Sequence, residues 1–182
     1  MINPLLVAYK ENYDSSTKVL TYNMLPKEGG FISTYCYDIG LYNYHRLNGN
    51  SVKGFAATKP VCNSDVMLLD FDDCKDEARK FYTFIKERGY TFRVYDSGNR
   101  SIHFHIKRDY IASSLLPKMD KAWVSKYAPK ADLSLYSSMH FYRLPNTVHS
   151  ETGKKKVLIE EVVGNNTLID YPEISTETFR YE

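Results

Sequence analysis

The sequence predicts an α+β fold built on a ferredoxin-like βαββαβ unit. Between residues 65 and 163, short segments with the two-residue periodicity of strands alternate with longer segments of helical periodicity. Their order is strand, helix, strand, strand, helix, strand, which is the order of this motif. The chain has 182 residues, 43% of them hydrophobic, which is enough for one domain with a substantial core. We therefore expect a single domain over residues 1–182.

The first strand and helix of this unit follow one another closely. Residues 66–71 form a continuous apolar run, which is typical of a central strand buried on both faces. Asp73 is placed to cap a helix, and Gly89 is placed to end it. The apolar residues at helical spacing between them are Cys74, Ala78, Phe81, Tyr82 and Ile85. We expect a helix of about four turns here.

The next two strands form a hairpin. Residues 90–95 alternate in polarity, and residues 96–99 read Asp-Ser-Gly-Asn, which is strong turn chemistry. In the strand that follows, Ile102, Phe104 and Ile106 occupy one face. His103 and His105 therefore share the opposite face, because side chains of a strand alternate.

The second helix and the last strands complete the unit. Ser113 or Ser114 opens the helix, and Pro129 lies just beyond its end. Strands are expected around residues 141–144 and 157–163, with a turn at 150–153. We expect the two helices to cover one face of the sheet and to leave the histidine face open.

The flanking regions carry weaker patterns. Residues 1–64 include a candidate helix at 4–13 and candidate strands at 18–23 and 31–37, and we expect an accessory α/β layer that extends the sheet. Residues 164–182 are polar, and we expect a tail that lies extended along the surface. The ferredoxin-like core is then residues 65–163.

Composition excludes several classes of protein. No apolar stretch is long enough to span a membrane and no secretion signal is apparent, so we expect an intracellular, cytoplasmic protein. Three separated cysteines indicate neither a disulfide framework nor a zinc site. The net charge of +2 does not by itself predict nucleic-acid binding. Tyrosine is frequent, with 16 residues, and the cluster at Tyr35, Tyr37, Tyr42 and Tyr44 is more often core than a base-stacking surface.

Asp70 and Asp72 carry the strongest chemical signal. They are two residues apart at the end of the apolar run, so both carboxylates point the same way. Carboxylate pairs of this kind hold divalent cations. Later segments add Asp132, His103 and Arg143, which together with a metal match the needs of a triphosphate. The residues predict nucleotidyl transfer.

The order of these segments resembles the archaeo-eukaryotic primase superfamily, the primase-polymerases of archaea, eukaryotes, plasmids and phages. The first motif of that family is a hydrophobic residue followed by D-x-D/E, which is similar to residues 69–72. Its second motif, S-G-x-x-G/S-x-H, is matched by Ser97, Gly98, Ser101 and His103.

Further motifs extend the resemblance over about residues 65–160. The third motif is an acidic residue, for which Asp132 is the candidate, with Asp120 as the alternative. An R-x-P-G-[ST] segment and a K-T-G-like turn are similar to residues 143–147 and 151–154. The resemblance implies an RRM-like catalytic sheet.

The resemblance also implies roles for individual residues. Two Mg²⁺ or Mn²⁺ ions would be bound by Asp70, Asp72 and Asp132. The incoming nucleoside triphosphate would be held by Ser101, His103 and Arg143, with Lys154 or Lys155 adding charge. Asn99 and Arg100 are weaker candidates for contact with phosphate or template.

The function expected from this resemblance is a template-dependent DNA primase and polymerase that adds dNTPs or NTPs to a 3′-hydroxyl. Its partners would be a single-stranded DNA template, a primer and a replicative helicase acting in trans or on a longer parent chain. The setting would be the replication of a phage, a plasmid or a similar replicon.

Two other interpretations stay open. His103-Phe104-His105 also fits the metal site of HUH endonucleases, which are Rep proteins and relaxases with a tyrosine nucleophile, and Tyr127 is a loose candidate for that nucleophile. A non-catalytic nucleic-acid-binding module would use the same sheet, but it would not need Asp70 or Asp72.

Overall fold

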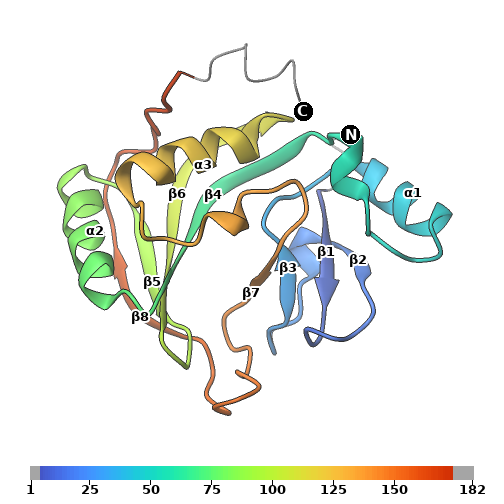
Figure 1. The fold of residues 1–182 in the computed structure, drawn as a ribbon, viewed down its shortest axis with the longest axis horizontal. Helices are drawn as coiled ribbons and strands as arrows, with labels where there is room; N and C mark the ends of the chain where they lie inside the picture. Colours follow the sequence, from blue (N-terminus) through green and yellow to red (C-terminus); the bar gives the residue numbers. More distant parts are fainter. Residues whose placement is uncertain (1–4, 174–182) are drawn as a thin grey trace.

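A computed structural model describes residues 5–173 as a mixed α+β structure with two antiparallel sheets of four strands each (Figure 1). We call the first the N-terminal sheet, which has the strand order β2-β1-β3-β7, and the second the core sheet, which has the order β4-β6-β5-β8. The strands of the N-terminal sheet are β1 (Leu6–Lys10), β2 (Lys18–Thr21), β3 (Phe31–Ser33) and β7 (Phe141–Arg143). The strands of the core sheet are β4 (Cys62–Asp72), β5 (Phe92–Asp96), β6 (Ser101–Ser113) and β8 (Val157–Val162).

Three α-helices accompany these sheets in the described part of the chain. They are α1 (Ile39–Leu47), α2 (Lys75–Glu87) and α3 (Leu116–Tyr127). Helices α2 and α3 pack on one face of the core sheet, as predicted, and α1 lies beside the N-terminal sheet (Figure 1). Three short 3₁₀ helices complete the fold: η1 (Tyr22–Met24), η2 (Phe55–Thr58) and η3 (Leu133–Leu135). No helix within residues 5–173 is both long enough and apolar enough to cross a bilayer.

The main hydrophobic core lies between the core sheet and its two helices. Phe71 and Phe104 project from neighbouring strands toward Phe81 of α2 and Trp123 of α3, and all four are almost fully buried. The ring of Phe104 meets that of Phe81 edge to face at 5.2 Å between centroids. These side chains bury large apolar areas and stabilise the predicted strand–helix pairing.

The expected order of elements is confirmed, but the last strand has an unexpected partner. In a ferredoxin-like sheet the final strand lies beside the first, whereas here β8 pairs antiparallel with β5. The preceding strand, β7, pairs with β3 and so belongs to the N-terminal sheet. The segment between β7 and β8 then returns past the β5–β6 turn, where Thr152 donates a hydrogen bond to the carbonyl of Gly98 (2.7 Å). This return places β8 next to β5.

The prediction that residues 1–64 extend the core sheet is wrong. Strands β1, β2 and β3 form their own sheet with β7, and an isolated bridge between Cys36 and Asn63 connects that region to β4. The expected helix at 4–13 is also wrong, since β1 occupies Leu6–Lys10. Residues 1–4 lie outside the described residues.

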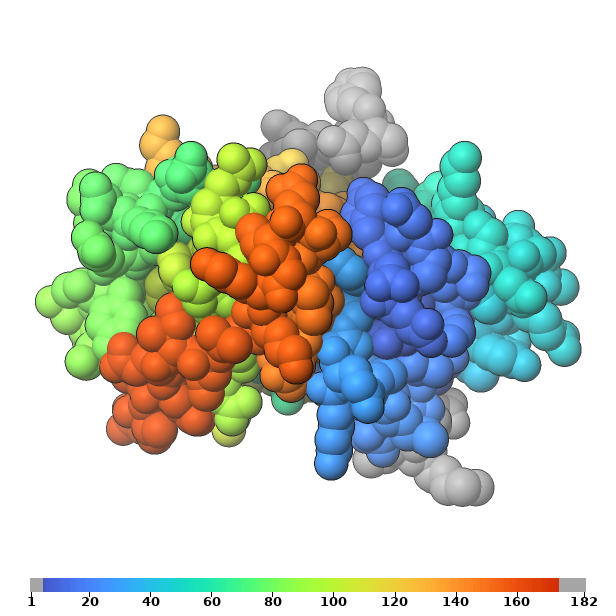
Figure 2. Space-filling view, turned by 90° about the horizontal axis from the view of Figure 1, so that it is seen from below, coloured from blue at the N-terminus to red at the C-terminus, as the bar shows by residue number. Residues whose placement is uncertain are grey.

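The histidine face of the core sheet is not open, contrary to our expectation. The N-terminal sheet lies against it, and the ring of Tyr142 on β7 is 5.1 Å from that of His103 and 5.5 Å from that of His105. Figure 2 shows the chain around residues 143–156, in orange, between the blue N-terminal sheet and the yellow-green β5–β6 region. We call the space between the two sheets the cleft, and the side of the core sheet that borders it the cleft face.

At the starts of α2 and α3, the N-cap residue is not the one that we predicted. Asp73 has a φ of +56°, so it turns the chain between β4 and α2 instead of capping the helix, whose N-cap is Cys74. Ser113 accepts a hydrogen bond from the backbone N–H of Leu115 (3.0 Å), the residue that precedes α3. Gly89 adopts φ +77° just beyond α2, as predicted for a helix end.

The start of the tail lies on the surface beside α2 and α3. The carboxylate of Asp170 accepts hydrogen bonds from the indole of Trp123 (3.2 Å) and the hydroxyl of Tyr127 (3.0 Å). This agrees with the prediction for an extended surface segment, while its remainder, residues 174–182, lies outside the described residues.

Candidate active site

The predicted acidic and histidine segments meet at one end of the cleft face. In the β4–β6 ladder Asp70 is paired with His103 and Asp72 with Ser101. Cross-strand partners have their side chains on the same face, so all four point into the cleft. Alternation along each strand, which places Phe71 and Phe104 in the core, therefore also assembles this group.

Asp70 is the more enclosed of the two carboxylates. Its side chain is 23% exposed, and its Oδ2 lies 3.5 Å from Nε2 of His103. Burial favours protonation, but the His103 and Ser101 side chains and the charge of Lys156 outweigh it and hold the pKa of Asp70 below its usual value. Its second oxygen, Oδ1, is buried and has no hydrogen-bond partner among the described residues. An orphaned carboxylate oxygen of this kind is a site for an external donor or cation.

Asp72 is more exposed and already has partners. Its Oδ1 accepts hydrogen bonds from Nε of Arg100 (3.0 Å) and from the hydroxyl of Ser101 (3.2 Å). Arg100, which sequence reasoning placed near phosphate or template, therefore lies against the acidic pair.

Asp132 reaches the same place through its backbone. Its N–H donates to the carbonyl of Asp70 (2.8 Å), but its carboxylate accepts from the N–H of Ser134 (2.9 Å) and so caps η3. Within residues 5–173 no group of three or more His, Cys, Asp or Glu side chains is arranged to hold a metal ion. A backbone hydrogen bond therefore brings Asp132 next to Asp70. The carboxylates of Asp70, Asp72 and Asp132 nevertheless do not form a closed set of metal ligands.

His103 is buried, and its closest polar contact is the ion-pair contact of Nε2 with Asp70. It is 3% exposed, and neither ring nitrogen has a hydrogen-bond partner within the described part of the chain. Burial lowers its pKa, and the charges of Lys156 and Arg143 act in the same direction, while Asp70 opposes them. Nε2 thus faces Asp70 beyond ideal hydrogen-bond distance and Nδ1 has no partner among the described residues, which is unusual for a folded interior, where polar groups are normally paired.

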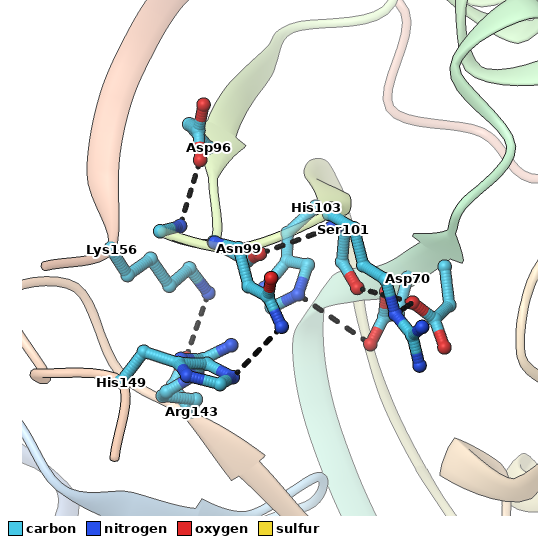
Figure 3. Close-up of polar contacts among 12 residues, drawn as sticks. Asp70, Asp96, Asn99, Ser101, His103, Arg143, His149 and Lys156 are labelled. Carbon is cyan, nitrogen blue, oxygen red and sulfur yellow. Dashed lines mark hydrogen bonds and ion pairs between the residues drawn. The ribbon is translucent and has the colours of Figure 1, made fainter. Parts of the chain in front are cut away.

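Basic residues lie on the other side of His103. Lys156 is fully buried and donates a hydrogen bond to the carbonyl of Arg143 (2.7 Å). Its Nζ is also 3.2 Å from Nε2 of His105 and lies over the rings of Tyr142 and Tyr95, at 4.2 and 4.9 Å from their centroids. Burial is the main reason that the pKa of Lys156 is well below its usual value. Figure 3 shows His103 between the Asp70–Ser101 group and the Arg143–Lys156 group.

The lysine at the site is not the one that the sequence singled out. Lys154 and Lys155 are exposed, and only the third residue of the run, Lys156, points inward. The backbone carbonyl of Lys154 instead lies 2.8 Å from the position that a Cβ would take at Gly98, so the lack of a side chain allows the approach.

Asn99 lies beside the same loop. Its Nδ2 is 3.4 Å from Nε2 of His149, a residue that the sequence analysis had not selected (Figure 3). The second motif and the K-T-G-like turn are therefore in contact.

The features needed for an HUH endonuclease are only partly together. His103 and His105 share the cleft face, as predicted, but Nε2 of His105 is occupied by Lys156. Tyr127 is on α3, where its ring stacks on Phe84 at 5.2 Å, and α3 covers the opposite face of the core sheet. The sheet therefore separates Tyr127 from both histidines.

Sequence reasoning missed Lys156, Tyr142 and His149. Three consecutive lysines look alike until strand pairing fixes which one is buried, and Tyr142 was considered only as part of a strand. No signal in the sequence identified Tyr142, because its place beside His103 depends on the pairing of β7 with β3.

The fold and site together define an α+β protein with a polar site at one end of a cleft between two antiparallel sheets. No protein-family model matches the chain. Curated proteins and solved structures likewise give no significant match.

Proposed function

We propose that the protein is a template-dependent primase-polymerase that transfers nucleotides to a 3′-hydroxyl. The observation that carries this proposal is the meeting of segments distant in sequence at one place. Carboxylates at residues 70 and 72 lie on one side of the buried His103, and Arg143 and Lys156 lie on the other. Nucleotidyl transfer needs this division between acidic and basic groups, because metal and triphosphate must lie side by side.

The basic side offers groups that suit a triphosphate. Within the described residues the Arg143 guanidinium makes no hydrogen bond or ion pair, so its planar fork of donors is free for phosphate oxygens. Nδ1 of His103, which has no partner among the described residues, would gain one when a phosphate oxygen lies beside it. Ser101 adds a hydroxyl at the carboxylate edge.

The acidic side offers carboxylate oxygens, which are suitable ligands for Mg²⁺ or Mn²⁺. Asp70 has a free buried oxygen, and Asp72 follows on the same face. Mg²⁺ is commonly bound by one or two carboxylates together with substrate phosphates, so a closed protein cage is not required. Asp70 and Asp72 would hold the ion, which requires Arg100 to leave Asp72, and Asp132 is the candidate third ligand. When bound, such an ion activates the attacking hydroxyl and neutralises phosphate charge.

The biological setting that we propose is replication of a phage, plasmid or similar replicon, with single-stranded DNA template and primer as partners. A helicase in trans or on a longer parent chain would supply the unwound strand. An HUH endonuclease stays the second candidate because His103 and His105 share one face, but the contact of His105 with Lys156 and the position of Tyr127 disfavour it.

The test is a synthesis assay with defined substitutions. The protein is incubated with single-stranded DNA, with and without an annealed primer, labelled dNTPs or NTPs, and Mg²⁺ or Mn²⁺. Products are separated on a denaturing gel. We expect Asp70→Asn and Asp72→Asn to abolish incorporation, because each removes a carboxylate charge from the metal side. The matched control is Asp76→Asn, which changes an exposed aspartate that pairs only with Arg79 on the surface of α2.

The outcomes separate the candidate functions. Extension that is lost in both cleft variants and kept in Asp76→Asn supports the proposal, and primer-free products identify true priming. Synthesis that persists in Asp70→Asn contradicts it. Metal-dependent cleavage that leaves a tyrosine-linked DNA end supports the HUH alternative, and strand binding without any metal-dependent reaction supports a binding module.

A further inference from the structure

A pocket of about 600 Å³ lies in the cleft between the two sheets, beside the candidate active site. His105 and Tyr142 line it, and the same two rings adjoin His103. The volume is within the range of pockets that hold small organic ligands, roughly 300–1,000 Å³. The pocket and the candidate nucleotide site are therefore adjacent.

The walls of this pocket are rich in aromatic rings from both sheets. Tyr95 and Tyr110 come from the core sheet, Tyr142 comes from β7, and Tyr22 follows β2 of the N-terminal sheet. Tyr110 is 57% exposed and Tyr22 is 46% exposed, although large aromatic side chains usually bury their rings. Exposed rings on two walls of a pocket suit a flat ligand that stacks between them.

The ring of Tyr142 lines the pocket where it adjoins His105, and Tyr142 is 4% exposed. Its hydroxyl is closed off from solvent and has no hydrogen-bond partner among residues 5–173, so it is not a contact for a ligand in the pocket. The lining therefore offers a ligand mainly the faces of its aromatic rings.

The charges on the walls argue against a phosphate in the pocket. Arg93 is paired with Glu161 at 3.4 Å, and Asp65 adds a second carboxylate. Lys107 is a second exposed cation of the lining, besides Arg93. The free Arg143 guanidinium is not among the residues that line this pocket. The pocket thus favours the base of a nucleotide with its phosphate outside.

We propose that this pocket holds an unpaired base of a single nucleic-acid strand. The inference rests on the proposed function, since a template-directed transferase must keep a strand base beside the incoming nucleotide. The base would stack against Tyr22 and Tyr110, the exposed tyrosine rings of the lining. A strand fits better than a free triphosphate because the phosphate-binding groups lie on the far side of His105 and Tyr142.

The test measures strand binding without metal or triphosphate. A labelled oligothymidylate is titrated with the full chain and followed by fluorescence anisotropy, and an abasic strand of equal length serves as the second probe. We expect Tyr110→Ala and Tyr22→Ala each to weaken oligothymidylate binding about tenfold, which is within the contribution of one stacked base. Tyr42→Ala, at an exposed tyrosine of α1, is the matched control and is expected to bind as the unchanged chain does. The abasic strand is expected to bind all four proteins with the same weak affinity.

Two results would overturn this proposal. One is oligothymidylate binding that is equal in Tyr110→Ala, Tyr22→Ala and Tyr42→Ala. The other is loss of triphosphate binding in the pocket variants with strand binding intact, because the free nucleotide would then occupy the pocket. The binding readout needs no synthesis, so failure of the proposed function, shown by unchanged incorporation in Asp70→Asn, is a separate outcome.

Discussion

The two faces of the core sheet are made by the same strands and differ in almost every chemical property. On the helix face, Phe71 and Phe104 pack at 5.6 Å between ring centroids and are covered by α2 and α3. On the cleft face, Asp70 and His103 keep buried polar atoms without hydrogen-bond partners in the described part of the chain, as does Tyr142 of β7, which packs against His103. The helix face carries a charged exception, the buried ion pair of Arg108 with Asp120 of α3, in which two guanidinium nitrogens also lack partners among the described residues. Adjacent residues of one strand thus serve opposite purposes, because successive side chains alternate between faces.

The difference separates what stabilises the fold from what serves a ligand. Apolar burial on the helix face contributes free energy of folding, whereas each unpaired polar group on the cleft face reduces it. A stabilising substitution at the cleft face would therefore be easy to find. Because Arg108 on the helix face also has unpaired nitrogens, such atoms alone do not mark a site. On the cleft face they lie together with Arg143 and Lys156, and this concentration of polar groups agrees with a functional requirement there.

The largest effect is expected at the helix face. Phe104→Ala should lower the free energy of unfolding by about 3–5 kcal/mol, because it removes a ring buried among Phe71, Phe81 and Phe92. Urea unfolding followed by circular dichroism measures the change. The neighbouring variant His103→Ala, on the cleft face, is the matched comparison and should cost much less. Equal losses at the two positions would remove the distinction between the faces.

Lys156 offers a more selective test of the cleft face. Lys156→Met keeps the volume of the side chain but removes the donor that holds the carbonyl of Arg143. We expect KM for the nucleoside triphosphate to rise about tenfold with little change in kcat, since Arg143 would lose its fixed position and one charge-assisted hydrogen bond is worth about 1.5–3 kcal/mol.

The control for this variant lies next in the chain. Lys155→Met removes the same charge from an exposed position and should leave KM unchanged. Melting temperatures of both variants show whether the fold is kept. If KM rose equally in both variants, Lys156 would act only through the net charge of the protein. Its position in the cleft would then have no role in nucleotide binding.

The sequence was informative where the pattern is local. Alternation in β6 was enough to place His103 and His105 together opposite Phe104, and Gly89 marked the end of α2. The pairing of strands that are distant in sequence was not predictable. No short sequence pattern indicates that β7 pairs with β3 or that β8 pairs with β5. The choice of Lys156 over Lys154 depends on that pairing, which is why the acidic half of the site followed from the sequence and the buried lysine did not.

The smallest expected effect is a pH dependence of stability that originates on the cleft face. Burial lowers the pKa of His105 well below its usual value, and the neighbouring Lys156, His103 and Arg93 act in the same direction. The folded chain therefore binds this proton less readily than the unfolded chain does. Above the ordinary histidine pKa of about 6.5 the difference has no effect on stability, and below it acid favours unfolding.

His105→Gln should consequently flatten the decrease in unfolding free energy between about pH 8 and about pH 5. His45→Gln on α1 is the control for the substitution itself, because it makes the same change at a histidine outside the cleft. Urea titrations at several pH values measure the slope, and each tenfold difference in proton affinity corresponds to about 1.4 kcal/mol. His103 is lowered in the same direction, so His105→Gln is expected to reduce the slope without removing it. If the slope were unchanged in His105→Gln, water and protons would reach His105 freely in the folded chain. The two faces of the core sheet would then differ mainly in their access to solvent.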